Sequence, residues 1–182
     1  DYQRAVVERL RSDLRRSVTH QLTAQQHQLG QLSARLATLG PGGMPHLTAM
    51  WFAVLDGPDR TGIRSELWFE TKAKSQKAVN LGRDPRATAL IEDGLTYDTL
   101  RGVSIEGRVE IYDDPDTCLR VGIAVWERYN GPYTDDLREA VEMMMHKRVA
   151  VRLRADRVRS WDHRKLGMPA MPLAGSTAEF YR

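Results

Sequence analysis

The chain has 182 residues, 41% of them hydrophobic and 28% charged, which is enough for one domain with a core of its own. The formal charge is only +3 and acidic residues are interleaved among the basic ones, which is weak evidence for nucleic acid and suits an anionic small ligand equally well. One cysteine, Cys118, excludes an internal disulfide, and no apolar run is long enough to span a bilayer. We therefore expect a cytoplasmic protein without nucleic-acid or membrane partners.

The first part of the chain is predicted to be helical. Apolar residues recur every three or four positions from Val6 to Leu29, and Gly30 suits the end of a helix over residues 3–29. A short coiled coil is the alternative to packing on the domain or on a partner subunit. We assign residues 1–30 to this N-terminal helix and residues 31–182 to a second unit with a C-terminal tail.

From residue 33 onward, alternating apolar and polar residues predict strands. The Gly/Pro-rich segment 40–43 marks a hairpin turn, and segment 56–62 has the composition of a loop. The strands expected in chain order are 34–39, 45–55, 65–71, 87–92, 102–112, 148–154 and a shorter, irregular one over 158–166. In the strand 65–71, Leu67 and Phe69 are expected to face one side, and Trp68 and Glu70 the other. Antiparallel neighbours that close on themselves predict a small barrel, in a fold that is mainly β with flanking helices.

Two helices are expected late in the chain. Pro115 begins the first, with Asp113 or Asp114 as its cap, and Tyr129-Asn130-Gly131-Pro132 ends it. The second starts near Thr134 and turns Leu137, Val141 and Met144 inward. The three methionines 143–145 are interpreted as core residues.

The junction between the strand 65–71 and the next helix carries the clearest candidate site. Ser75 is expected to cap the helix, and Ala78, Val79 and Leu81 supply its apolar stripe. Gly82 suits the helix end, and Asp84-Pro85 prevents the helix from continuing. Three lysines, Lys72, Lys74 and Lys77, fall at the start of this helix. Free N–H groups at a helix start and clustered ammonium groups favour an anion, above all a phosphate, although a solvated loop is the simpler alternative.

Several segments, in this order and spacing, resemble the pyridoxamine 5′-phosphate oxidase-like split β-barrel superfamily, and within it the actinobacterial flavin/deazaflavin oxidoreductases of the B group. The likeness covers about residues 33–176. The segments are Pro45-His46-Leu47-Thr48-Ala49-Met50-Trp51-Phe52, Thr71-Lys72-Ala73-Lys74-Ser75-Gln76-Lys77, Asn80-Leu81-Gly82-Arg83-Asp84-Pro85-Arg86, Leu100-Arg101-Gly102-Val103-Ser104-Ile105-Glu106-Gly107 and Ser160-Trp161-Asp162-His163-Arg164-Lys165-Leu166.

The resemblance implies a homodimer of six-stranded antiparallel split β-barrels, FMN-binding-protein-like, with cofactor at the subunit interface. It implies that the backbone of Ala49, Met50, Trp51 and Phe52 lies along the cofactor ring, and that Trp161 and Arg164 close the site from the second subunit. The residues implied to hold the phosphate are Thr71, Lys72, Lys74, Ser75 and Lys77.

Departures from the oxidase pattern decide which cofactor the resemblance favours. Lys72 replaces an asparagine, Gln76 replaces an arginine, and Thr48 stands where the oxidase has a further arginine. This chain therefore lacks two guanidinium groups that would grip phosphate, which argues against the vitamin B6 phosphate reaction. The lysine cluster suits coenzyme F-420 instead, a deazaflavin that B-group members commonly bind; FMN is the alternative, and others in the superfamily bind haem.

The resemblance thus implies a coenzyme F-420-dependent oxidoreductase that transfers a hydride between reduced deazaflavin and a small organic acceptor. An FMN-dependent oxidoreductase and a non-catalytic flavin or deazaflavin binder are the alternatives. No obligatory acid is evident; His46 and His163 are candidates by position only, each equally readable as a structural histidine. The histidines are scattered and no HExxH spacing occurs, so no metal site is expected.

Overall fold

The computed structural model describes residues 32–57 and 65–171, whose strands form one antiparallel sheet in the order β2-β1-β5-β6-β7-β4-β3. The predicted helix 3–29 and most of the predicted loop 56–62 lie outside these residues. Within them, no helix has the length and apolar character needed to cross a membrane. The strands are β1 (Ala34–Leu39), β2 (Pro45–Met50), β3 (Phe52–Asp56), β4 (Ser65–Lys72), β5 (Arg86–Asp93), β6 (Arg101–Tyr112) and β7 (Arg148–Asp162).

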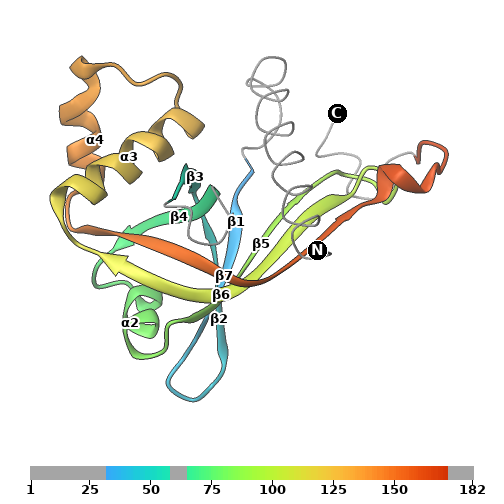
Figure 1. Cartoon of the computed structure of the whole chain (residues 1–182), viewed down its shortest axis with the longest axis horizontal. Helices are drawn as coiled ribbons and strands as arrows, with labels where there is room; N and C mark the ends of the chain where they lie inside the picture. The colour runs from blue at the N-terminus through green and yellow to red at the C-terminus, as the bar shows by residue number, and fades with distance from the viewer. Residues whose placement is uncertain (1–31, 58–64, 172–182) are drawn as a thin grey trace, which may run out of the picture.

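The sheet curls into a split barrel because its two edges are consecutive in the chain. β2 lies at one end of the strand order and β3 at the other, and only Trp51 separates them. The prediction of a single strand over 45–55 is therefore wrong at Trp51, where the chain leaves one edge and joins the other (Figure 1). If β2 and β3 are counted as one interrupted strand, the expected six strands are present.

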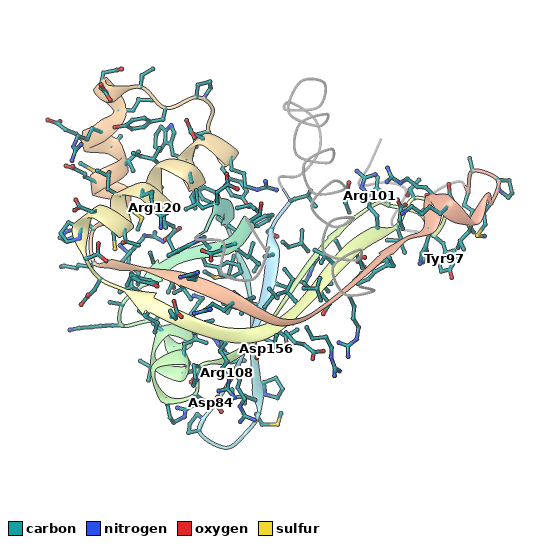
Figure 2. All side chains as sticks on the ribbon, in the orientation of Figure 1. Asp84, Tyr97, Arg101, Arg108, Arg120 and Asp156 are labelled. Atoms are coloured by element: carbon teal, nitrogen blue, oxygen red, sulfur yellow. The ribbon has the colours of Figure 1, made fainter. Side chains whose placement is uncertain are left out.

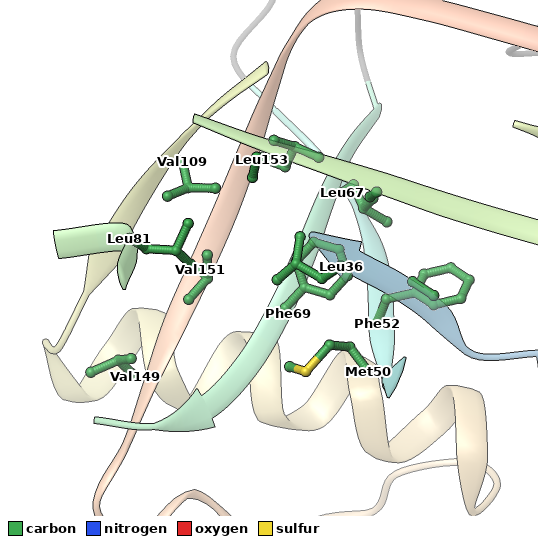
Figure 3. Packing of buried hydrophobic residues seen from close by; sticks show 13 residues of the cluster. Leu36, Met50, Phe52, Leu67, Phe69, Leu81, Val109, Val149, Val151 and Leu153 are labelled. Atoms are coloured by element: carbon green, nitrogen blue, oxygen red, sulfur yellow. The ribbon is translucent and has the colours of Figure 1, made fainter. Parts of the chain in front are cut away.

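Alternation along β4 divides the core between the two faces of the sheet. Leu67 and Phe69 point into the barrel, where they pack with β1, β3 and β7 side chains (Figure 3). Trp68 points the other way, into a second cluster with Val121, Val125 and other residues of the helices. The sequence-based prediction that these β4 residues face opposite sides is confirmed.

Among the described residues, three α-helices flank the barrel: α2 (Gln76–Arg83), α3 (Pro115–Tyr129) and α4 (Arg138–Met145). Asp114 caps α3, accepting a 2.8 Å hydrogen bond from the Thr117 N–H, as the Asp-Pro sequence predicts. The second late helix starts later than expected, because residues 135–137 form a 3-10 turn (η1) before α4 begins. Met145 is buried and Met144 packs at its edge, but Met143 is 78% exposed, so the prediction of a core role is wrong for that residue.

Helix α2 presents a different face to the barrel than its apolar residues suggest. Val79 is 54% exposed, whereas Asn80 is fully buried beside Leu81. The Asn80 amide donates to Thr38 Oγ1 at 3.1 Å and accepts from Gln76 at 2.9 Å, which removes the cost of burying it. The helix also continues through Gly82 to Arg83, with Asp84 as its C-cap.

Strand β7 is continuous, where two strands over 148–154 and 158–166 were expected. Its register against β6 shifts between Glu106 and Gly107, so that Asp156 is the extra residue of a β-bulge. The bulge moves the inward residues of β7 from odd positions to even ones, which gives the sequence the appearance of a second strand. The short 3-10 helix η2 (His163–Leu166) then ends this part of the chain.

Gly107 sits at the bulge with no room for a side chain, since a Cβ atom there would lie 1.9 Å from the Arg154 carbonyl oxygen. We predict that Gly107→Ala lowers the free energy of unfolding by about 2 kcal/mol in urea titrations, because β6 and β7 must separate locally. Gly82→Ala is the matched control: nothing lies within 4 Å of its Cβ, and alanine favours the helix. Equal stability of the two variants would contradict the prediction.

Candidate functional site

The turn between β4 and α2 is fixed by its own hydrogen bonds. Thr71 is buried, and its hydroxyl lies 3.1 Å from that of Ser75. Ser75 caps α2 by accepting from the Ala78 N–H at 3.3 Å, which confirms the predicted N-cap. The Ala73 N–H donates to the Lys147 carbonyl at 3.0 Å and ties the turn to the start of β7. The backbone at the start of α2 is therefore held in place.

The same turn leaves positive groups without counter-charges. The first N–H groups of a helix have no partner within the helix, and the Ser75 cap satisfies only that of Ala78, which leaves those of Gln76 and Lys77 for an external acceptor. Lys72 and Lys74 are exposed and Lys77 is partly buried. None of the three lysines forms an ion pair with a carboxylate among the described residues.

One of the three ammonium groups is already held by the protein. Lys72 Nζ donates to the His146 carbonyl oxygen at 2.9 Å, which leaves two of its three N–H bonds for another acceptor. Lys74 and Lys77 make no such contact in the described structure. The residues at this turn thus fit a phosphate, which accepts several hydrogen bonds and carries the opposite charge.

The Met50–Phe52 segment, where β2 passes into β3, lies next to this turn and is called the seam below. Phe52 pairs with Phe69 on β4, only two residues before Thr71. Met50 and Phe52 point into the barrel and are buried, whereas Trp51 is 42% exposed. Ala49, the last residue before the seam, is exposed. The structure therefore brings the seam and the lysine turn, which the sequence places in separate motifs, to adjoining positions.

The end of α3 packs on the seam. Trp51 stacks on Tyr129, with ring centroids 4.7 Å apart and planes 11° from parallel. The Tyr129 hydroxyl accepts from the Phe52 N–H at 3.3 Å and donates to the Leu32 carbonyl at 2.7 Å. Burial raises the pKa of this phenol, so it remains a donor at neutral pH. Arg128 also packs on the seam, with its guanidinium carbon 4.0 Å from the centroid of the Phe52 ring.

Arg128 and Tyr129 are functional candidates that the sequence did not reveal. Tyr129 was interpreted only as part of a helix-breaking segment. The one available signal was a basic residue beside an aromatic one at the end of a helix, which is too common to mark a site. Their position depends on the curled sheet, which brings the seam to the end of α3.

Trp161 and Arg164 lie away from the lysine turn within one chain. They belong to the arm, which we define as residues 91–104 and 158–171, the outer ends of β5, β6 and β7 with their connecting segments. Figure 2 labels Tyr97 and Arg101 on the arm and Asp84 beside α2, at well-separated positions. A single chain therefore does not bring together all the residues that the resemblance assigns to the cofactor.

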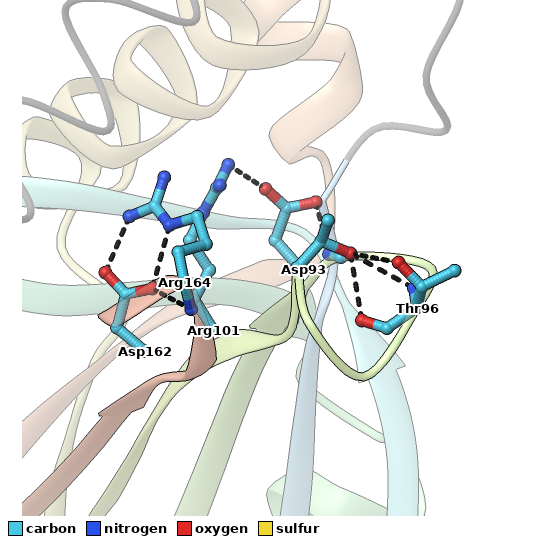
Figure 4. Close-up of polar contacts among 7 residues, drawn as sticks. Asp93, Thr96, Arg101, Asp162 and Arg164 are labelled. Atoms are coloured by element: carbon cyan, nitrogen blue, oxygen red, sulfur yellow. Dashed lines mark hydrogen bonds and ion pairs between the residues drawn. The ribbon is translucent and has the colours of Figure 1, made fainter. Parts of the chain in front are cut away.

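The side chains of the arm are fixed by contacts of their own. Trp161 pairs with Gly102 and covers it, since a Cβ atom at Gly102 would lie 2.5 Å from the indole ring. The Arg164 guanidinium makes two hydrogen bonds to Asp162, at 2.8 and 2.7 Å, and the Arg164 N–H donates a third at 3.2 Å (Figure 4). His163 Nδ1 lies 2.8 Å from the Tyr97 carbonyl oxygen, which fits the structural interpretation of this histidine.

The Arg164 guanidinium holds the pKa of Asp162 at about 2. A carboxyl whose pKa is lower in the folded state stabilises the fold above its unfolded pKa, about 3.9, and loses that contribution as the pH falls towards 2. We predict that Asp162→Asn lowers the urea midpoint at pH 7, and that the difference from wild type shrinks as the pH falls below about 4 and is mostly lost by about pH 2. A difference that is constant from pH 7 to pH 2 would show that the carboxylate charge has no role.

Other candidate groups have simpler roles. His46 lies on β2 with Nδ1 buried and without a hydrogen-bond partner among the described residues. Burial raises the pKa of the Cys118 thiol, which contacts the Tyr112 carbonyl at 3.6 Å and belongs to the helix-side core. Nowhere in residues 32–57 and 65–171 do three His, Cys, Asp or Glu side chains come together as metal ligands.

Comparison with known families identifies the chain. A family model described as pyridoxamine 5′-phosphate oxidase matches residues 22–162, which is most of the sequence. This chain belongs to the pyridoxamine 5′-phosphate oxidase family. The split barrel seen in Figure 1 is the fold of this flavin- and deazaflavin-binding family, and the resemblance drawn from the sequence is confirmed.

Solved structures of similar proteins extend the comparison. The conserved hypothetical protein Rv2991 from Mycobacterium tuberculosis is 55% identical, with a TM-score of 0.73 over 84% of this chain and 99% of that one. A structure described as an F-420 reductase is 29% identical, with a TM-score of 0.52 over 71% of this chain and 90% of that one.

More distant similarity shows the fold alone. The haem storage protein HutZ from Vibrio cholerae is 11% identical, with a TM-score of 0.54 over 80% of this chain and 94% of that one. A comparison with curated proteins finds no match.

Proposed function

We propose that this member of the pyridoxamine 5′-phosphate oxidase family is a coenzyme F-420-dependent oxidoreductase acting on a small organic acceptor. The observation that carries the proposal is the lysine turn, where three ammonium groups and two helix N–H groups lack an anionic partner in the described structure. The 29% identity to the protein described as an F-420 reductase supports the same assignment. FMN, which also carries a phosphate, is the alternative cofactor.

We also propose that the protein is a homodimer that binds its cofactor at the subunit interface. Two observations support this arrangement. The arm, with Trp161 and Arg164, lies away from the lysine turn of its own chain, so a shared site requires the arm of a second subunit. The outer side of β2 also exposes an apolar residue, since Leu47 is 63% exposed, and a partner would cover it.

In the proposed mechanism, the protein binds and orients the reactants. Lys72, Lys74 and Lys77 hold the phosphate, and the rigid Thr71–Ser75 turn keeps them in position. A bound deazaflavin supplies two-electron hydride chemistry, which belongs to the cofactor. The backbone of the seam orients the cofactor ring, and Trp161 and Arg164 of the partner subunit exclude water from the site. No side chain is assigned as an obligatory acid.

A parallel titration tests the cofactor. The full chain is mixed with FMN and with coenzyme F-420, and quenching of cofactor fluorescence gives both dissociation constants while sedimentation equilibrium gives the mass. We expect a dimer that binds F-420 at micromolar concentration or tighter, and FMN more weakly. Tighter FMN binding would favour the FMN alternative, and a monomer that binds neither would overturn the proposal.

A turnover assay separates an enzyme from a binder. Reduced F-420 is incubated with the protein and with a panel of enones, quinones and tetrapyrroles, and its reoxidation is followed by absorbance. We expect protein-dependent reoxidation with at least one acceptor class. A protein that binds the cofactor tightly but oxidises it with none of them would favour the non-catalytic alternative.

A further inference from the structure

Arg128 is a guanidinium group at the seam that has no counter-charge among the described residues. Of the fourteen arginines among the described residues, eight pair with carboxylates, and Arg128 is one of the six that do not. Its Nε atom is buried and has no hydrogen-bond partner in the described structure. The Nε atoms of Arg148 and Arg152 are likewise unpartnered, but those guanidinium groups pair with Glu70 and Glu66 through another nitrogen. Arg128 has no such carboxylate among the described residues, and a buried charged donor without an acceptor is costly, so a ligand oxyanion would supply what is missing.

The surroundings of Arg128 hold its charge in one place. The guanidinium carbon lies 4.0 Å from the centroid of the Phe52 ring and 5.7 Å from that of Tyr129. Tyr129 is itself fixed by hydrogen bonds to the Phe52 N–H and the Leu32 carbonyl. A guanidinium stacked on fixed rings keeps its donor directions fixed as well, which favours a planar two-oxygen acceptor over a bulk anion.

An aromatic surface lies beside this charge. Trp51 stacks on Tyr129 through one face of its indole ring, and the residue remains 42% exposed. Trp51 also belongs to the seam, beside the lysine turn that we assign to the cofactor phosphate. The two positive groups come from different elements: the lysine turn precedes α2, and Arg128 lies near the end of α3.

We propose that Arg128 binds the oxyanion of a planar, acidic substrate whose ring system lies against Trp51. The inference rests on the proposed function, because it names the substrate class of the same site. A carboxylate accepts two N–H bonds from the guanidinium, satisfies the buried donor and neutralises the charge, while Trp51 contributes apolar contact. The site thus selects acids over their neutral analogues.

The test compares an acid with its amide on the same ring system. The full chain is titrated with 2-naphthoate and with 2-naphthamide by isothermal calorimetry. We expect wild type to bind the acid about tenfold more tightly, Arg128→Gln to lose that preference, and Arg128→Lys to keep only part of it because an ammonium offers no planar fork. If wild type shows no preference for the acid, the inference is overturned.

Arg120→Gln is the matched control. Arg120 lies on the same helix and likewise stacks over an aromatic ring, 5.0 Å from the centroid of Trp68, but away from the seam. The Arg120→Gln variant is expected to bind both probes as wild type does. If it loses the preference for the acid as fully as Arg128→Gln does, the inference is overturned. If Arg128→Gln fails to fold, Arg128→Lys decides the question, because it retains a cation against Phe52. In that case we expect its affinity for 2-naphthoate to be at least threefold lower than that of wild type, and an unchanged affinity would overturn the inference.

Titration of the same variants with FMN and F-420 identifies the source of the oxyanion. Unchanged cofactor affinity in Arg128→Gln supports a substrate acid. A tenfold loss of cofactor affinity, with the acid preference intact, would place a cofactor oxyanion at Arg128 and overturn the substrate assignment. Failure of wild type to bind either cofactor counts against the proposed function, and the naphthoate result is independent of that outcome.

Discussion

Lys77→Ala is expected to weaken cofactor binding at least tenfold. Lys77 is the partly buried member of the cluster, and its backbone N–H is one of the two helix-start donors without an acceptor in the described structure. A hydrogen bond to a charged group is worth about 1.5–3 kcal/mol, and tenfold in affinity corresponds to about 1.4 kcal/mol. The measurement is a fluorescence titration of variant and wild type with F-420 and FMN.

The control for this variant removes one positive charge elsewhere. Arg138 lies on the exposed side of α4 and pairs with Glu142 at 2.8 Å, so Arg138→Ala changes the net charge equally without touching the turn. Its cofactor affinity is expected to remain within about twofold of wild type at moderate salt, where distant surface charges are screened. Equal losses in both variants would mean that net charge, rather than the lysine turn, governs binding.

The parts of the fold that the sequence predicted well are those with local signals. The Ser75 cap and Asp84-Pro85 bound α2 closely, and Asp114-Pro115 starts α3 at the expected residue. The β4 alternation also assigned Leu67 and Trp68 to opposite faces. In each case the determining contacts lie within a few residues along the chain.

The predictions that were wrong depend on contacts between distant residues. Nothing near Trp51 signals a break, because the break comes from curling of the sheet. Asn80 is buried instead of Val79 because Thr38, on β1, supplies a partner for its amide. The bulge at Asp156 does leave a trace, the change of alternation after Leu153, but two strands explain that trace equally well.

The candidate site shows the same division. The lysine turn is a local motif and was found from its spacing, whereas Arg128 needed the structure. The predicted contribution of Trp161 and Arg164 to the cofactor site stays a prediction, because it depends on a second subunit. Sequence reasoning thus located the lysine turn but not the α3 side of the seam.

The largest effect on stability is expected from Arg152→Met. Arg152 lies on β7 between β4 and β6, where it pairs with Glu66 and, at 3.3 Å, with Glu110. The side chains of Arg152 and Glu66 are only 14% and 13% exposed. Removing the guanidinium leaves two carboxylates close together, one of them mostly buried. We expect the free energy of unfolding to fall by about 3 kcal/mol, measured in urea.

A second change separates lost pairing from lost packing. Methionine keeps most of the volume and the apolar contact that Arg152 makes near Trp68, so the loss is chiefly electrostatic. The double variant Arg152→Met/Glu66→Gln removes the uncompensated charge as well and is expected to regain about half of the loss, since a buried pair is often replaceable by neutral groups. Additive destabilisation would instead show that each side chain contributes through packing alone, because coupled partners in one network do not add.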